Sequence, residues 1–271
     1  MAPSSTRRGG WWGSSPSNSG FTAGPLVRYF LNREDTKVRV ADIEPEKAAS
    51  LVGRHPSGEA FALDLADEAR LSREIQASDI VISLVPAAFH PAVARLCVAR
   101  GKNMITTSYV SDAMRELDAD ARRAGVVLVN EAGLDPGIDH MEAMRIIDEV
   151  HGAGGKVLGF TSYCGGVPAP DANTNPFGYK FSWSPRGVLL AGKSAARYLK
   201  DGKEVYVPAE SLFDGCATVG IEGLGEFEAY PNRNSMPYIE MYGIPETRTM
   251  LRGTLRYPGW CETLKKIGEI G

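Results

Sequence analysis

Short apolar segments alternate with segments of helical spacing over the first half of the chain. The apolar segments predict strands, and they are KVRVAD (37–42), AFALDL (60–65), DIVISLVP (79–86), NMITTSYV (103–110) and VVLVN (126–130). The intervening segments, such as EPEKAASLVGR and PAVARLCVARG, place apolar residues on one helical face. Strands that alternate with helices of about ten to fourteen residues predict a parallel sheet with helices on both faces. We therefore expect an α/β fold with a Rossmann-like, doubly wound sheet.

The pattern changes after Asp148. KVLGFTSYCGG (156–166) predicts a longer strand, and the next segment, PAPDANTNPFGYKFSWSPRG, predicts a loop. Shorter strands and turns are expected in EVYVPAE, ATVGIEGLGEFEAYP and YIEMYG. These features predict a second α/β domain that is rich in sheet and supplies loops to a cleft. We expect a Rossmann-like dinucleotide-binding domain at 20–134 and a substrate-binding and dimerisation domain at 135–271.

The first twenty residues, MAPSSTRRGGWWGSSPSNSG, are rich in Gly, Ser and Pro and show neither helical nor strand periodicity. Such a composition buries too little apolar surface to order a chain, so we expect residues 1–19 to be largely disordered. They also lack the apolar segment of a signal peptide, and no apolar run approaches the ~20 residues of a membrane span.

The overall composition is that of an ordinary globular protein. The chain has 271 residues, 43% of them hydrophobic, and a formal net charge of −3. This slight acidity argues against a nucleic-acid or membrane partner, because both favour a basic face. Cys97, Cys164, Cys216 and Cys261 lie far apart without a CxxC pair. We expect four reduced thiols in a cytoplasmic protein.

NSGFTAG (18–24) has the features of a dinucleotide-binding turn before the first predicted helix. Asp42 ends the next predicted strand, 22 residues after Gly20 (42 − 20), where Rossmann folds bind the adenosine ribose. The turn departs from GxGxxG at Asn18, and no apolar strand precedes it. A glycine-rich helix cap and a strand-end Asp would fit the same residues. Asp42 followed by Ile43, without an Arg, favours NAD, because a 2′-phosphate would meet a negative charge.

NEAGLDPGIDHMEAMRIID (130–148) concentrates titratable groups where a strand passes into a helix. LDPG predicts a turn that holds Asp135 at the rim of the sheet, with Gly137 allowing a tight bend. Asp139 is interpreted as the helix N-cap and Glu142 as its capping-box partner. For His140 a structural hydrogen bond is favoured over an acid–base role. The spacing matches no closed metal-ligand set, so no metal is expected. His55, His90 and His151 are interpreted as surface or loop histidines.

Long motifs across the chain resemble saccharopine dehydrogenase of the glutamate-forming type, also called saccharopine reductase. They are TTSYVSDAM, NEAGLDPGIDHMEAMRIIDEVH, SYCGGVPAPDANTNPFGYKFSWSPRGVLLAG, EAYPNRNSMPYIEMYGI and RGTLRYPGWCETL, and the resemblance extends from about Gly20 to the last residue. It implies a Rossmann domain followed by an α/β substrate domain that also forms a homodimer. The implied reaction, in lysine metabolism, joins 2-aminoadipate 6-semialdehyde and glutamate as an imine and reduces it to saccharopine with NADP or NAD.

The resemblance also assigns site residues. The implied cofactor contacts are Ser19, Gly20, Phe21, Thr22, Asp42, Asp64, Leu84, Val85, Thr107, Ser108, Leu134 and Pro136. The implied substrate contacts are Ser108, Tyr109, Asp135, Trp183, Arg233, Arg252 and Thr254. Asp135 and Tyr109 are the expected catalytic residues, and the arginines suit the substrate carboxylates because a guanidinium donates two parallel N–H bonds.

The sequence departs from the family at both ends. The family begins with a Val- and Leu-rich strand where this chain has GWWGSSPSNS, and it continues beyond ETLKKIGEIG. We therefore expect an incomplete Rossmann sheet without its first, central strand and a truncated second domain. Two alternatives stay open: a catalytically impaired fragment of the family, and a related amino-acid or polyamine dehydrogenase such as a carboxynorspermidine-type reductase.

Overall fold

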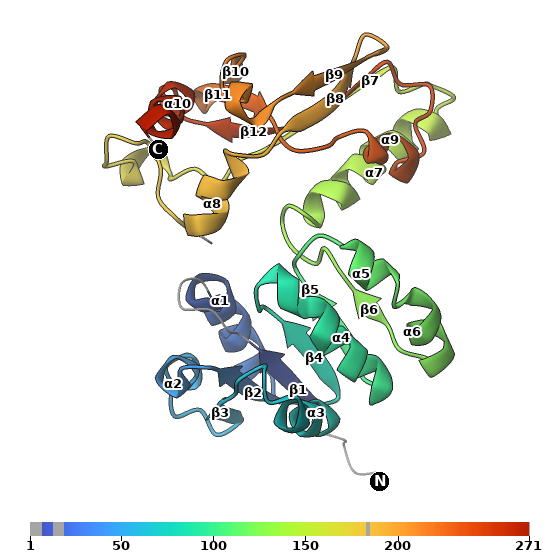
Figure 1. Cartoon of the computed structure of the whole chain (residues 1–271), viewed down its shortest axis with the longest axis vertical. Coiled ribbons are helices and arrows are strands. Elements are labelled where there is room, and N and C mark those ends of the chain that lie inside the picture. The colour runs from blue at the N-terminus through green and yellow to red at the C-terminus, as the bar shows by residue number, and fades with distance from the viewer. Residues whose placement is uncertain (1–6, 13–18, 183–184, 271) are drawn as a thin grey trace. The chain divides into compact units, whose positions relative to one another are not determined.

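The chain forms two compact units, which are described separately. The computed structural model describes residues 7–12, 19–182 and 185–270. Unit 1 comprises residues 1–138 and unit 2 comprises residues 139–271 (Figure 1). No helix in the described part of the chain combines the length and apolarity needed to cross a membrane.

Unit 1 is built around a six-stranded parallel sheet with the strand order β3-β2-β1-β4-β5-β6. Its strands are β1 (Arg7–Trp12), β2 (Thr36–Asp42), β3 (Gly58–Ala62), β4 (Ile80–Ser83), β5 (Asn103–Thr106) and β6 (Leu128–Val129). Its helices are α1 (Ser19–Leu31), α2 (Pro45–Val52), α3 (Glu68–Gln76), α4 (His90–Ala99), α5 (Asp112–Arg115) and α6 (Asp118–Ala124). This is the strand order of a Rossmann fold, so the predicted α/β class is confirmed.

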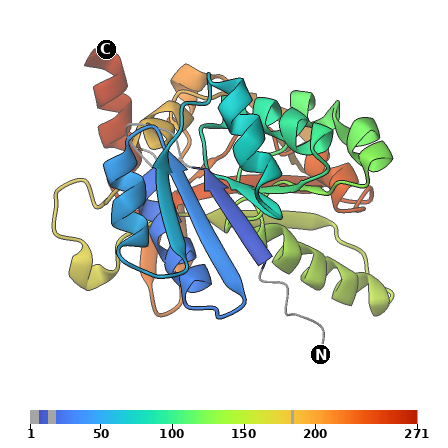
Figure 2. The same cartoon turned by 90° about the horizontal axis from the view of Figure 1, so that it is seen from below.

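Side chains of the central strands alternate between two apolar cores. Val38, Val40 and Ile82 pack with α1 and α2 on one face of the sheet. Val81 and Met104 pack with α3, α4 and α5 on the other. Successive residues of a strand point to opposite faces, so near-continuous apolar strands are buried only when helices cover both faces. Figure 2 shows the strands of this sheet side by side with helices beside them.

The expectation of a missing central strand is wrong. Arg7–Trp12 form β1, which pairs in parallel with β2 on one side and with β4 on the other (Figure 1). The expected disorder of residues 1–19 is therefore contradicted at 7–12, while 1–6 and 13–18 lie outside the described residues. A central strand is selected by backbone hydrogen bonds on both edges, and these do not require the apolar alternation that RRGGWW lacks.

Helix α1 begins earlier than predicted. NSGFTAG was expected to form a turn, but Ser19 to Gly24 are already helical and Pro25 lies inside the helix. Gly20 thus belongs to the first helical turn, and Asn18 lies outside the described residues.

Unit 2 contains a mixed sheet with the strand order β10-β11-β12-β8-β9, and β7 pairs in parallel with β12. Its strands are β7 (Gly159–Cys164), β8 (Ala196–Lys200), β9 (Lys203–Val207), β10 (Ala217–Ile221), β11 (Gly225–Pro231) and β12 (Thr249–Arg256). Its helices are α7 (Ile138–Gly152), α8 (Pro185–Ala191), α9 (Pro237–Met241) and α10 (Trp260–Ile270). The predicted sheet-rich α/β unit is confirmed, but YIEMYG belongs largely to helix α9 rather than to a strand.

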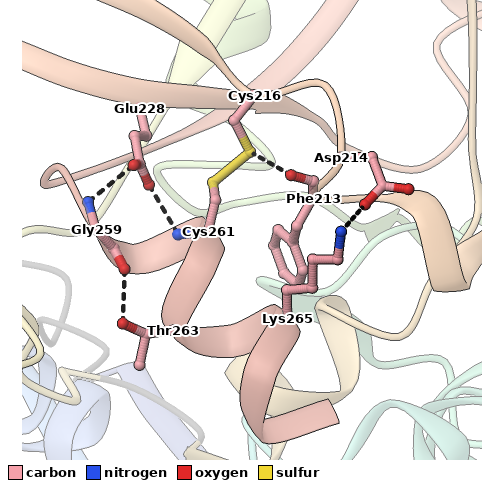
Figure 3. The surroundings of a disulfide bond; sticks show 8 residues. All are labelled: Phe213, Asp214, Cys216, Glu228, Gly259, Cys261, Thr263 and Lys265. Atoms are coloured by element: carbon pink, nitrogen blue, oxygen red, sulfur yellow. Dashed lines mark hydrogen bonds and ion pairs between the residues drawn. A yellow bond between two sulfur atoms is a disulfide. The ribbon is translucent and has the colours of Figure 1, made fainter. Parts of the chain in front are cut away.

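A disulfide corrects the prediction of four reduced thiols. Cys216, just before β10, is bonded to Cys261 in the first turn of α10 (Figure 3). Glu228 on β11 caps the same helix, because its carboxylate oxygens accept the backbone N–H groups of Gly259 (2.8 Å) and Cys261 (2.7 Å). Residues 45 positions apart meet because the β10–β11 hairpin carries one of them toward the end of β12, which sequence spacing does not reveal.

We expect Cys261→Ser to destabilise unit 2. Closing a loop of 45 residues restricts the unfolded chain and contributes about 4 kcal/mol in the chain-entropy account. The free energy of unfolding, measured by chemical denaturation without reductant, should fall by about 2–4 kcal/mol. Cys164→Ser is the matched control, because Cys164 is not in a disulfide. Thiol titration of unfolded wild-type protein should count two thiols before reduction and four after it; four at the start would contradict the bond.

Candidate functional site

Polar residues gather at the ends of β4 and β5 in unit 1. Ser83 and Thr106 are the last residues of these strands and lie opposite each other in register. Leu84 and Val85 follow β4, and the Val85 side chain is buried in the core. Ligands of open α/β sheets bind outside the carboxyl ends of the strands, so this edge is where a coenzyme site is expected.

His90 connects the two strand ends. Its Nδ1 lies 2.9 Å from the Ser83 hydroxyl, and its Nε2 lies 3.0 Å from the Thr106 hydroxyl and 2.9 Å from that of Ser108. The backbone N–H of Ser108 also donates to Thr106 Oγ1 at 3.3 Å. One imidazole at the start of α4 therefore touches three hydroxyl groups from two neighbouring strand ends.

The interpretation of His90 as a surface or loop histidine is wrong. The residue is 2% exposed, and burial lowers the pKa of its imidazole to about 4. Burial disfavours the charged form of a base, so the ring is neutral at neutral pH. Sequence reasoning missed it because FHP reads as an ordinary helix start, although hydroxyl residues at the ends of adjacent predicted strands were a usable signal.

Tyr109 and Asp135, the two expected catalytic residues, lie in contact. The Tyr109 hydroxyl donates a hydrogen bond of 2.6 Å to Asp135 Oδ1, and both side chains are half-buried. The segment after β6 runs beside the segment after β5, because Glu131 N–H donates to Ser108 O and Glu131 Oε1 accepts Val110 N–H. Glu131 is a further residue of this edge that the sequence did not single out.

Gly137 allows the bend that places Asp135. Its φ is +149°, and a Cβ there would lie 2.2 Å from Gly133 O and 2.5 Å from Glu131 O. No side chain fits this space, so the predicted need for glycine at the tight turn is confirmed. Leu134 is exposed and Pro136 is buried on either side of Asp135, within the same turn.

The remaining expected cofactor residues of unit 1 lie at strand ends or at the helix start. Asp42 ends β2, is 4% exposed, and accepts the Glu44 N–H at 3.0 Å. Asp64 is exposed after β3 and accepts the Ala66 N–H at 2.9 Å. Thr107 is exposed after β5, and Thr22 is exposed on α1. Ser19, Gly20 and Phe21 form the beginning of α1.

Arg252 of unit 2 is buried and held by an acidic partner. Its Nη2 donates to Asp139 Oδ2 at 2.6 Å, and its guanidinium lies 4.3 Å from the Tyr238 ring centroid. The capping-box interpretation of Asp139 and Glu142 is therefore wrong, since Asp139 lies within α7 and Glu142 pairs with Arg145 at 2.6 Å. The hydrogen bond favoured for His140 is present, between its Nδ1 and the Tyr242 hydroxyl, at 2.7 Å.

Arg233 and Thr254 belong to the same region of unit 2. The loop after β11 lies alongside β12. Asn232 N–H donates to Arg252 O, and Arg252 N–H donates to Ser235 Oγ. Arg233 is exposed in this loop, and its φ is +54°. Thr254 is half-buried on β12 opposite Tyr230. The expected substrate contact Trp183 lies outside the described residues.

A pocket in the described part of unit 2 has a volume of about 790 Å³. It is lined by Arg197, Asn234, Met236, Pro237, Ile239, Glu240, Gly243 and Pro245. None of these is an expected site residue, although Asn234 follows Arg233 directly. The expected residues are therefore distributed over the sheet edge of unit 1 and the β11–β12 region of unit 2.

Strand order and the polar sheet edge place unit 1 in the Rossmann class of dinucleotide-binding folds. A family model described as the saccharopine dehydrogenase NADP binding domain matches residues 19–129. A second, described as the saccharopine dehydrogenase C-terminal domain, matches residues 133–271. The chain belongs to the saccharopine dehydrogenase family.

Named relatives agree with this family. The L-glutamate-forming, NADP⁺ saccharopine dehydrogenase of Schizosaccharomyces pombe is 44% identical over 93% of this chain and 56% of the relative. The mitochondrial alpha-aminoadipic semialdehyde synthase of Bos taurus is 39% identical over 93% of this chain and 27% of its own length. The apo saccharopine dehydrogenase (L-Glu forming) from Saccharomyces cerevisiae superimposes with a TM-score of 0.87 at 43% identity, covering 97% of this chain and 58% of that one. The chain thus spans about half the length of the fungal enzymes that it matches.

We expect His90 to make stability depend on pH between pH 6.5 and pH 4. Below its ordinary pKa of 6.5 the unfolded imidazole takes up a proton, whereas the buried ring stays neutral down to about pH 4. The free energy of unfolding should therefore fall as the pH falls, by roughly 3 kcal/mol across the window. Denaturation of wild type and His90→Gln at pH 7, 6 and 5 should show a flatter dependence in the variant, with His55→Gln as the control. Parallel curves for wild type and His90→Gln would contradict the assignment.

Proposed function

We propose that this chain carries the activity of an L-glutamate-forming saccharopine dehydrogenase, linked to NADP or NAD. In that reaction 2-aminoadipate 6-semialdehyde and glutamate form an imine, and its reduction gives saccharopine. The observation that carries the proposal is the hydrogen bond of 2.6 Å between Tyr109 and Asp135, beside Ser108 at the sheet edge of unit 1. The names of the fungal relatives support the same reaction.

The sheet edge of unit 1 has features that suit a dinucleotide. The strand order reverses direction between β1 and β4, and α1 begins at Ser19 after the central strand. The first turn of a helix presents unpaired N–H groups and a partial positive charge, which suit a diphosphate. Val85 turns its side chain into the core, so its backbone is the part that a coenzyme would contact. Thr107 and Ser108 add hydroxyl groups after β5.

Tyr109 and Asp135 suit the polar half of imine reduction. A bound nicotinamide supplies the hydride, whereas the nitrogen of the C=N bond needs a proton. The Asp135 carboxylate can accept a hydrogen bond from a protonated imine or amine, and the Tyr109 hydroxyl fixes its orientation at 2.6 Å. Because both side chains are half-buried, the carboxylate is partly shielded from water while it is open to a ligand.

The arginines of unit 2 suit the substrate carboxylates. Arg233 is exposed in the loop after β11, where a guanidinium can donate two parallel N–H bonds. Arg252 is positioned by Asp139 and Tyr238, so its direction is fixed before any ligand binds. Thr254 adds a hydroxyl two residues along β12. We assign unit 2 to substrate recognition and to a homodimer interface, in a cytoplasmic protein; light scattering of the purified chain tests the dimer.

Coenzyme binding and turnover test the proposal. Purified chain should quench NADPH or NADH fluorescence saturably and should oxidise the coenzyme only when semialdehyde and glutamate are both present. Tyr109→Phe should lower kcat by about 10²-fold, because the carboxylate loses the donor that orients it, with little change in coenzyme affinity. Tyr206→Phe, on an exposed tyrosine of β9, is the matched control.

Each failure of this test has a distinct meaning. Coenzyme binding without turnover would support a non-catalytic member of the family. Turnover with a diamine in place of glutamate would support a polyamine dehydrogenase. An unchanged kcat in Tyr109→Phe would exclude Tyr109 from the reaction.

Asp42 should weaken NADPH binding relative to NADH. Its carboxylate ends β2, where the adenosine ribose binds in Rossmann folds, and a 2′-phosphate there meets a like charge. We expect Asp42→Asn to shift the ratio of the two dissociation constants toward NADPH by about tenfold. Fluorescence titration of both coenzymes measures the ratio, and Asp64→Asn, on the neighbouring strand end, tests whether the effect is local. An unchanged ratio in Asp42→Asn would show that the 2′-phosphate of NADPH does not lie near Asp42.

A further inference from the structure

The segments after β4 and β5 are joined by a side-chain network that backbone pairing does not require. Ile80–Ser83 and Asn103–Thr106 already pair in register through the backbone. Ser83, His90 and Thr106 are nevertheless polar, and they are 0%, 2% and 1% exposed. A buried polar network is tolerated only when its members are hydrogen-bonded to one another, whereas apolar residues would fill the same space without that requirement. A role beyond holding the two strands together would account for this choice.

The network has one open end. Ser83, His90 and Thr106 are buried, whereas Ser108 is half-buried at the sheet edge. The imidazole cannot turn without losing contacts, because Ser83 lies on Nδ1 and Thr106 lies on Nε2. Nε2 is therefore held in one position, and it contacts the Ser108 hydroxyl at 2.9 Å. Side-chain groups held by buried partners are pre-organised for a ligand.

We propose that His90 is a positioning residue of the coenzyme edge, which aligns the Ser108 hydroxyl through Nε2 and fixes the segment 106–108 against the segment 83–85. The inference rests on the proposed function, because it assigns the ligand of this edge. His90 touches no substrate in this account and acts through its contacts with Ser83, Thr106 and Ser108.

Two amide substitutions separate positioning from simple packing. The terminal amide of Gln can replace Nε2, which faces Ser108, whereas that of Asn reaches only as far as Nδ1, which faces Ser83. Both variants remove the ring, so a structural role predicts similar losses of stability and similar coenzyme affinities. The positioning role predicts that His90→Gln keeps the dissociation constant for NADPH or NADH within about threefold, whereas His90→Asn weakens it about tenfold.

Coenzyme titration by fluorescence, together with chemical denaturation, measures both properties in the full chain. His55→Gln is the matched control, because His55 lies in the loop before β3, outside the network. Equal affinities of the Gln and Asn variants, with wild type binding normally, would overturn the inference alone. Wild-type protein that binds neither coenzyme would overturn the proposed function and this inference together.

Imidazole ¹⁵N resonances provide a measurement that does not depend on the variants folding. The chain has four histidines, so the resonances of His90 can be assigned. Coenzyme binding should shift the Nε2 resonance of His90, because the Ser108 hydroxyl that Nε2 holds gains a second partner in the coenzyme, and should leave His55 unchanged. An Nε2 resonance that does not move at saturating coenzyme would overturn the positioning role.

Discussion

Backbone pairing between β4 and β5 is the constraint on which the site of unit 1 depends. It places Ser83 opposite Thr106, so the residues that follow each strand emerge side by side at one edge of the sheet. His90 then bridges the two ends, and the segment of Glu131 lies along that of Ser108. A shift of one residue in either strand would exchange the faces of all its side chains and dissolve both the apolar cores and the polar edge.

Fixed polar contacts organise each unit separately. In unit 1 the contact of Tyr109 with Asp135 depends on Gly137, because no other residue fits the bend. In unit 2 the pair of Arg252 with Asp139 ties β12 to the first turn of α7. Removing one partner of a buried ion pair leaves the other charge buried and unpaired, which is costly. Such contacts therefore hold both side chains in one position.

Much of the fold was predictable from apolar periodicity, whereas the ends of elements and several partners were not. The strands around Val38, Val81 and Met104 were visible because both faces of a parallel sheet are buried. β1 was not, because RRGGWW carries no apolar alternation and is ordered by its neighbours on both edges. The pattern of YIEMYG predicts a strand rather than helix α9, because a five-residue helix is too short to show helical periodicity.

The sequence by itself determined the alternation of strands and helices, the glycine required at position 137 and the family to which the motifs belong. These depend on local geometry or on long runs of residue types, which are present in the chain as written. Only the tertiary structure decided that His90 is buried, that Asp139 pairs with Arg252, and that Cys216 meets Cys261. All three depend on residues that are far apart in the sequence, and nothing in their spacing predicts that they meet. Sheet register and the paths of the loops bring them together.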